Sequence, residues 1–206
     1  MTAPRKRTAI LISGRGSNMT ALIAAAKDPD YPAEIALVVS NRPHAGGLAI
    51  AGAAGIATAI VDHVTYQDRV AFDAALDQVL SAHGIELVCL AGFLRMLTPA
   101  FVEKWRGRMI NVHPALLPQF KGLDTHARAL AAGVKAHGAT VHFVSAEVDS
   151  GPTIMQATVP VRDDDTEETL AARVLTQEHR IYPEALRLVA EGRASMNGLH
   201  PSKSAQ

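Results

Sequence analysis

Apolar runs of strand length alternate along the first half of the chain with stretches in which apolar residues recur at helical spacing. In residues 69–82, for example, Val70, Ala74 and Leu76 lie near one face of a helix. The alternation predicts βαβ units and a mostly parallel sheet. The expected strands are residues 8–13, 35–40, 58–61, 87–91 and 109–112, and the expected helices are residues 19–27, 48–54, 69–82 and 99–105.

The pattern changes after residue 113. Residues 114–125 form a long loop with Pro and Gly, and such a length inside a compact domain is typical of a binding role. Two further apolar runs indicate a hairpin added at a sheet edge. The expected elements are a short helix at 127–132, strands at 140–144 and 154–159 joined through 146–152, and a long helix at 167–189 that Pro183 bends or restarts.

Length and composition favour one α/β domain: an open, mostly parallel twisted sheet with helices on both faces and an antiparallel edge hairpin in the C-terminal half. Lysine and arginine number 20, as do aspartate and glutamate, so no nucleic-acid or membrane partner is expected, only small-molecule substrates. The sole cysteine, Cys89, lies in an apolar run and reads as a buried thiol. The apolar run near the N-terminus is too short for a secretory signal, so the expected location is cytoplasmic.

A polar pair stands where a buried strand ends. Asn111 and His113 share one strand face because side chains alternate with period two, and Pro114 then stops the strand. Asp149 follows in a Gly- and Pro-containing turn that is expected to lie over the sheet edge. A carboxylate near an imidazole favours its protonated form, and the amide can stabilise an oxyanion. Because no serine or cysteine nucleophile accompanies them, the three residues favour acyl transfer by direct attack of a substrate amine.

The first strand runs into Ser13-Gly-Arg-Gly16-Ser17-Asn18 and then into a helix. Backbone N–H groups at a helix start, with two glycines and Ser17 as a possible cap, predict an anion site suited to phosphate. A tight strand-to-helix turn is the simpler alternative. The loop departs from both the dinucleotide and the P-loop patterns.

A second loop, residues 91–99, places one arginine, Arg95, among large apolar residues. Apolar walls with one cation suit a flat aromatic ligand that carries a carboxylate. An ordinary core turn explains the same pattern equally well.

The nine histidines follow no zinc-binding spacing, and no metal is expected. His142 alternates with apolar neighbours and reads as an ordinary strand residue, while His126 reads as a loop contact. The acidic run at 163–168 is better explained by helix capping than by metal binding.

These segments together resemble phosphoribosylglycinamide formyltransferase, a folate-dependent family of purine synthesis. The resemblance covers nearly the whole chain and rests on segments in order: Ile12-Ser-Gly-Arg-Gly-Ser-Asn18, Leu90-Ala-Gly-Phe-Leu-Arg-Met-Leu-Thr-Pro99, Asn111-Val-His-Pro-Ala-Leu-Leu-Pro118, Lys121-Gly-Leu-Asp-Thr-His126, His137-Gly-Ala-Thr-Val-His-Phe-Val144, Asp149-Ser-Gly-Pro152 and Gln177-Glu-His-Arg-Ile-Tyr-Pro183. It implies a Rossmann-like fold and formyl transfer from 10-formyltetrahydrofolate, a co-substrate, to the amine of 5-phosphoribosylglycinamide. It also implies a catalytic domain over 1–190, with phosphate bound by the N-terminal half and folate and catalysis in the C-terminal half. The last dozen residues mix polar and apolar types without a period, so the tail over 191–206 is expected to be flexible.

The resemblance also implies roles for individual residues. His113 corresponds to the proton-transfer catalyst, Asp149 to the carboxylate that raises its basicity, and Asn111 to the group that binds the formyl oxygen. The substrate contacts are implied at Gly16, Ser17, Asn18 and Glu178, and the folate contacts at Arg69, Leu94, Arg95, Met96, Leu97 and Asn111.

Two relatives with the same three catalytic residue types remain as alternatives. A methionyl-tRNA formyltransferase would carry an extra C-terminal domain, and a formyltetrahydrofolate deformylase an extra N-terminal one, so the length of 206 residues argues against both. A nucleotide-binding module without catalysis is a third alternative, but it would lack the catalytic residues. The pattern leaves monomer and homodimer open.

Overall fold

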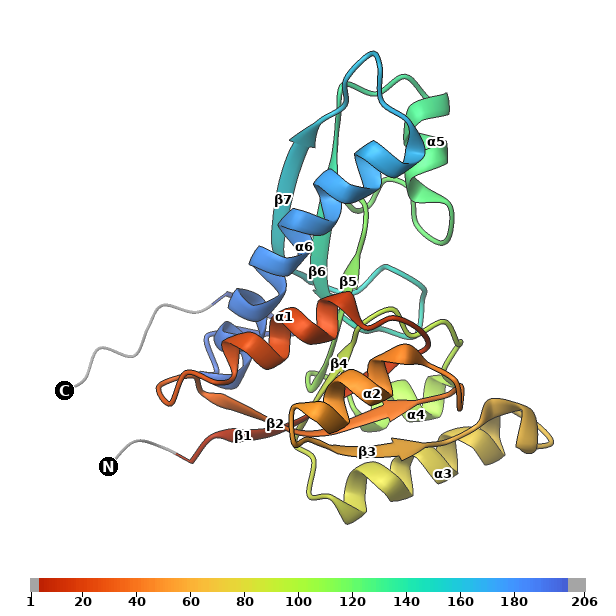
Figure 1. The fold of residues 1–206 in the computed structure, drawn as a ribbon, viewed down its shortest axis with the longest axis vertical. Coiled ribbons are helices and arrows are strands. Elements are labelled where there is room, and N and C mark those ends of the chain that lie inside the picture. The colour runs from red at the N-terminus through yellow and green to blue at the C-terminus, as the bar shows by residue number, and fades with distance from the viewer. Residues whose placement is uncertain (1–3, 200–206) are drawn as a thin grey trace.

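A computed structural model describes residues 4–199 and places their seven long strands in one sheet of order β3-β2-β1-β4-β5-β6-β7 (Figure 1). The pairs from β3 to β5 are parallel, and β6 and β7 pair antiparallel at the other edge. This confirms the expected mostly parallel sheet with an edge hairpin. The strands are β1 (Lys6–Ile12), β2 (Ala33–Ser40), β3 (Ala57–Ile60), β4 (Leu87–Leu90), β5 (Met109–His113), β6 (Ala136–Phe143) and β7 (Thr153–Pro160).

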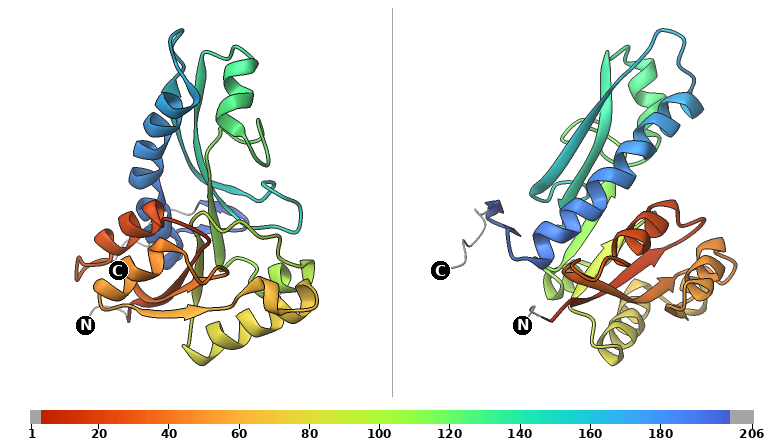
Figure 2. Two further views of the ribbon diagram at one scale, coloured as in Figure 1. Left: turned by 45° about the vertical axis from the view of Figure 1, so that its right-hand side comes forward. Right: turned by 60° about the vertical axis from the view of Figure 1, so that its left-hand side comes forward.

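Helices cover both faces of the sheet, as the alternating side chains of β1 require. Ile10 and Ile12 pack into one apolar cluster with α1, α2, α5 and α6, whereas Ala9 and Leu11 pack into a second cluster with α3 and α4. Figure 2 shows α6 running along β6 and β7. The helices are α1 (Ser17–Ala25), α2 (Gly46–Ala53), α3 (Arg69–Ala82), α4 (Pro99–Lys104), α5 (Thr125–Ala131) and α6 (Glu167–Ala190), with a 3-10 turn, η1, at His63–Thr65.

Three local expectations need correction. Ser17 does not cap α1, because the cap position is Gly16 in the left-handed conformation and the helix begins at Ser17 itself. Strand β6 begins at Ala136, four residues before the expected start, because it pairs with β7 along its whole length. Helix α6 runs without interruption through Pro183, so it does not restart there.

The acidic run before α6 has the expected capping role. Thr166 forms a capping box with Thr169, and Glu167 and Glu168 occupy the first turn. Asp165 holds Arg173 through two contacts of 2.7 Å. The run is therefore accounted for by the start of the helix.

The expected tail, residues 191–206, is described only in part. Within it, β8 (Ala194–Ser195) and β9 (Gly198–Leu199) pair as a small antiparallel sheet, and Ala194 is buried against the core. Residues 200–206 lie outside the described part of the chain, so the flexibility of the tail stays a prediction. No helix within residues 4–199 is long and apolar enough to cross a membrane.

Candidate active site

The candidate residues gather at the carboxyl ends of the central parallel strands, the edge at which open α/β sheets bind ligands. Asn111 and His113 close β5, the loop after β1 carries Gly16 and Asn18, and the loop after β4 carries Arg95. We call residues 14–18 the glycine loop and residues 94–97 the apolar loop. The strand order is β1-β4-β5, so the apolar loop follows the strand next to β5 and the glycine loop follows the strand beyond it, at the same edge of the sheet (Figure 1).

Asn111 and His113 lie on the same face of β5, as expected from their spacing. The antiparallel register sets Asn111 opposite His142 and His113 opposite Thr140 on β6. His113 is buried and Asn111 half-buried, so the pair borders the protein interior. A buried imidazole at a strand end can exchange protons with a ligand above the sheet.

Asp149 reaches this pair from the turn between β6 and β7. Its Oδ2 lies 3.3 Å from Nδ1 of His113, and its Oδ1 lies 3.6 Å from Nε2 of His142. The N–H of Gly122 donates to Oδ2 at 2.8 Å, which ties this turn to the loop after β5. Asp149 has a φ of 49°, a conformation that costs a non-glycine residue energy and that recurs at functional sites.

Both ring nitrogens of His113 face oxygen atoms. Nε2 donates to the carbonyl of Phe120 at 2.9 Å, and Nδ1 faces Asp149. Burial lowers the pKa of His113, and although the Phe120 carbonyl and the Asp149 carboxylate raise it, the net pKa lies below the ordinary value. The imidazole is therefore neutral near pH 7 and has an acceptor ready for each proton once it becomes charged.

Burial raises the pKa of Asp149, but the contacts with His142, the Gly122 N–H and His113 outweigh it, so the net pKa is lowered. The carboxylate is therefore ionised at neutral pH. It supplies the negative charge that an imidazolium at His113 needs.

His142 belongs to this site, although its sequence pattern indicated an ordinary strand residue. Its Nδ1 donates to the Phe143 carbonyl at 2.8 Å. Its Nε2 lies 3.3 Å from the Asn111 amide nitrogen and 3.6 Å from Oδ1 of Asp149, so it accepts from Asn111 when the ring is neutral and donates to Asp149 when the ring is protonated. This contact holds Asn111 with one N–H still available for a ligand oxygen. The cross-strand pairing of β5 and β6 was the signal that could have revealed it.

Asp149→Asn is expected to shift the pH dependence of the reaction. The neutral amide no longer favours the imidazolium, so the pKa of His113 falls further. A reaction that needs neutral His113 as proton acceptor loses rate as pH falls through that pKa, so the acidic limb of kcat/KM should move to lower pH. Glu147→Gln, an exposed carboxylate of the same turn, is the matched control; identical limbs in all three proteins would remove Asp149 from the proton transfer.

The glycine loop comes close to a neighbouring helix start. Gly16 has a φ of 76°, and a Cβ on Gly47 would lie 2.5 Å from the side chain of Ile12. The Gly47 N–H donates to the Gly14 carbonyl at 3.0 Å. These contacts fix the loop, and helix α1 begins at Ser17, shortly after the carboxyl end of β1, so the free N–H groups of its first turn lie at the sheet edge where a ligand would bind.

Asn18 and Glu178 meet although 160 residues separate them. The Asn18 amide donates to Oε2 of Glu178 at 2.5 Å, which joins the start of α1 to the middle of α6. Burial raises the pKa of Glu178, partly opposed by this hydrogen bond. The structure thus brings together two of the four residues expected to contact the phosphorylated substrate.

The apolar loop presents two large side chains outward. Leu94 is 62% exposed and Met96 53% exposed, whereas Leu97 packs against the second apolar cluster. The guanidinium of Arg95 lies 4.8 Å from the ring centre of Phe72 on α3. Arg69 opens that same helix, so the two arginines expected near folate lie at the same end of α3.

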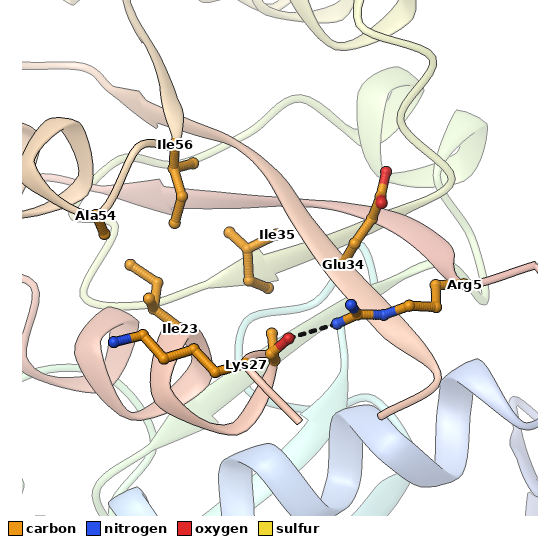
Figure 3. Close-up of a pocket in the computed structure, with 8 residues that line it drawn as sticks. Arg5, Ile23, Lys27, Glu34, Ile35, Ala54 and Ile56 are labelled. Carbon is orange, nitrogen blue, oxygen red and sulfur yellow. Dashed lines mark hydrogen bonds between the residues drawn. The ribbon is translucent and has the colours of Figure 1, made fainter. Parts of the chain in front are cut away.

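No group of three or more His, Cys, Asp or Glu residues within residues 4–199 is arranged to hold a metal ion. The neighbouring rings of His126 and His137 pack against each other edge to face, with 5.3 Å between their centres. A separate open hollow lies near the amino ends of β1 and β2, where Arg5 donates to the Ala26 carbonyl at 2.5 Å (Figure 3). None of the candidate site residues lines it.

Comparison with known proteins gives one consistent result. The model of a family described as formyl transferase matches residues 6–186. The chain is 45% identical to phosphoribosylglycinamide formyltransferase of Escherichia coli over 188 aligned residues. This alignment covers 91% of this chain and 89% of that protein. It is 50% identical over 188 residues to the human trifunctional purine biosynthetic protein adenosine-3, but it spans only 19% of the length of that relative.

Solved structures agree. Glycinamide ribonucleotide transformylase 1 of Symbiobacterium toebii superposes with a TM-score of 0.89 at 48% identity, covering 92% of this chain and 89% of that one. Phosphoribosylglycinamide formyltransferase of Brucella melitensis gives a TM-score of 0.87 at 51% identity, with 90% and 96% covered.

Proposed function

Because the chain belongs to the formyl transferase family, we propose that it transfers a formyl group from 10-formyltetrahydrofolate to the amine of 5-phosphoribosylglycinamide, a step of de novo purine synthesis. The observation that carries the proposal is the placement of Asp149 at 3.3 Å from His113, at the same sheet edge as the apolar loop and the glycine loop, which follow the next two strands, β4 and β1. An acid–base pair that shares one sheet edge with an anion site and an apolar site suits transfer between a phosphorylated substrate and a folate.

In the proposed mechanism the substrate amine attacks the formyl carbon directly. A C–N bond forms, and the free N–H of Asn111 donates to the oxygen that becomes negative. His113 accepts the proton that the amine loses, and Asp149 stabilises the resulting imidazolium. The bond from the formyl carbon to N10 of the folate then breaks, and the proton held by His113 passes to that nitrogen.

Nδ1 is the proposed site of proton exchange on His113. Nε2 is engaged by the Phe120 carbonyl at 2.9 Å, whereas the 3.3 Å separation of Nδ1 from Asp149 is longer than a charge-assisted hydrogen bond. The neutral imidazole that burial favours is the form that accepts a proton.

Both substrates have proposed binding groups. The glycine loop, through Gly16, Ser17 and Asn18, binds the phosphate by backbone N–H groups at the start of α1, and Glu178 accepts from a ribose hydroxyl. The exposed Leu94 and Met96, with Leu97, provide apolar surface for the folate rings, and Arg69 and Arg95 provide cations for its carboxylates.

Glu178→Gln is expected to raise the KM for phosphoribosylglycinamide by roughly 10-fold, because the amide can still accept from Asn18 but replaces the second acceptor oxygen with a donor. The KM for the folate should stay unchanged. Steady-state kinetics with each substrate varied in turn measures both values. Glu184→Gln, exposed on the same helix, is the control, and an equal change in both KM values would place Glu178 elsewhere in the mechanism.

We also propose the extent of the catalytic domain, its cellular location, its oligomeric state and its partners. Residues 1–190 would form the catalytic domain, acting in the cytoplasm as a monomer or homodimer on small-molecule substrates without nucleic-acid or membrane partners. A formal net charge of zero supports this choice of partners.

The decisive experiment is formylation of phosphoribosylglycinamide by the purified protein, with formate release and tRNA formylation as parallel assays. Formylation of the glycinamide alone is the expected result. Formate release without transfer would instead favour a deformylase-like hydrolase, and binding of a phosphorylated nucleoside independently of folate, without turnover, a non-catalytic module.

A further inference from the structure

Ser13 connects the loops of two different strands. It follows β1 directly, and its N–H donates to the Gly92 carbonyl at 3.1 Å. Its Oγ accepts from the N–H of Leu94 at 2.8 Å, and the side chain is almost fully buried. The residue before the glycine loop therefore holds the first residue of the apolar loop.

The hydroxyl of Ser13 has a second partner, Asn41, which fixes its orientation. Because the Leu94 N–H can only donate, the single hydroxyl proton of Ser13 goes to Oδ1 of Asn41 at 2.6 Å. The backbone carbonyl of Asn41 in turn accepts from Nδ1 of His63 at 2.7 Å. These hydrogen bonds thus link Leu94 in the apolar loop, through Ser13 at the end of β1, to Asn41 after β2 and His63 after β3.

The apolar loop is held at both ends by buried side chains. Ser13 binds the N–H of Leu94, and Asp73 of α3 accepts from the N–H of Thr98 at 2.7 Å. Both anchoring residues are 4% exposed. Only Ser13 is also joined through the backbone to the glycine loop, so it alone of these two anchors can set the distance between the loops.

We infer that Ser13 is a positioning residue: its hydroxyl fixes the apolar loop, and with it the folate, relative to the glycine loop and the phosphorylated substrate. This inference rests on the proposed function. Formyl transfer needs the amine and the formyl carbon in near-contact geometry, so a small shift of one loop against the other slows the reaction without removing any catalytic group.

Ser13→Ala leaves the Leu94 N–H and Oδ1 of Asn41 without a partner, and both groups will move to find one. We expect kcat to fall and the KM for 10-formyltetrahydrofolate to rise, with kcat/KM for the folate lowered by roughly 30-fold. The KM for phosphoribosylglycinamide should change less than about two-fold, because the glycine loop keeps its backbone contacts to Gly47.

The matched control is Thr8→Val. Thr8 lies in β1, and its buried hydroxyl donates to the Lys6 carbonyl of the same strand rather than to a group in either loop. This substitution should lower the melting temperature without separating the two KM values. Ser13→Cys replaces the hydroxyl oxygen by a larger but still weakly polar atom, and it should restore part of the folate kcat/KM; it also serves as the test if Ser13→Ala does not fold. Amide hydrogen exchange should be faster over residues 92–98 in Ser13→Ala than in Thr8→Val.

Kinetics and exchange together decide the inference. Wild-type turnover with Ser13→Ala, or equal rises in both KM values that follow the loss of stability seen for Thr8→Val, would overturn the positioning role and leave the proposed function intact. Failure of the wild-type protein to transfer a formyl group would overturn the proposed function, and the positioning role with it.

Discussion

Replacing His113 by alanine is expected to lower kcat for formyl transfer by about 10³-fold, within the range that general acid–base catalysis provides. The variant removes the imidazole that faces both Asp149 and the Phe120 carbonyl, which is the proposed acceptor for the proton of the attacking amine. Asn111 stays in place through His142 and still stabilises the oxyanion, which accounts for a residual rate.

A binding measurement on this variant should show that substrate affinity is retained although catalysis is lost. The glycine loop and Glu178 do not contact His113, so calorimetry should give the wild-type affinity for phosphoribosylglycinamide. His83→Ala is the control, because that half-buried imidazole bonds to the Val79 carbonyl at the far end of α3. Retention of more than about a tenth of the wild-type kcat by His113→Ala would contradict the mechanism.

Gly151→Ala is expected to damage the site without changing any reacting group. A Cβ at this position would lie 1.8 Å from the carbonyl oxygen of Phe143, a distance that forces the backbone to move. The turn that moves carries Asp149, whose distances to His113 and His142 then change. Misplacement by about 1 Å can cost roughly 100-fold, so we expect a loss of kcat of that size together with a lower melting temperature.

The matched change is Gly52→Ala. A Cβ there meets no atom within 4 Å, and the residue lies inside α2, so alanine should stabilise the protein by about 0.5–1 kcal/mol with unchanged kinetics. Thermal unfolding and steady-state rates of the two variants make the comparison. Wild-type kcat and melting temperature in Gly151→Ala would show that the turn does not need glycine and that Asp149 is not held by it.

Most of the fold follows from the order and spacing of apolar residues. The alternation of strand-length runs with helical periodicity predicted the parallel strands, and β6 and β7 form the expected hairpin. Element ends were less predictable, because they depend on partners: the length of β6 is set by β7, and the start of α1 by the conformation of Gly16. Local sequence does not contain that information.

The candidate site likewise has features that were predictable from local sequence and features that were not. The period-two geometry of a strand was enough to place Asn111 and His113 on one face, and two glycines after a strand were enough to indicate an anion site. Whether Arg69 and the apolar loop bind folate stays a prediction. His142 was not foreseen as part of the site, because its role depends on its position opposite Asn111 in a register that neither strand specifies alone.

The sequence by itself thus determined most of the elements, the strand face that Asn111 and His113 share and the chemical types available at the strand ends, because these depend on short-range backbone geometry. It did not determine the buried face of α3, where Val70, expected beside Leu76, is 67% exposed. The tertiary structure decided which of these groups meet. Asp149 lies between two imidazoles, Asn18 bonds to Glu178 and Ser13 holds Leu94 only because strand order and loop closure bring distant segments to one edge of the sheet. Those contacts are long-range, and no local pattern encodes them.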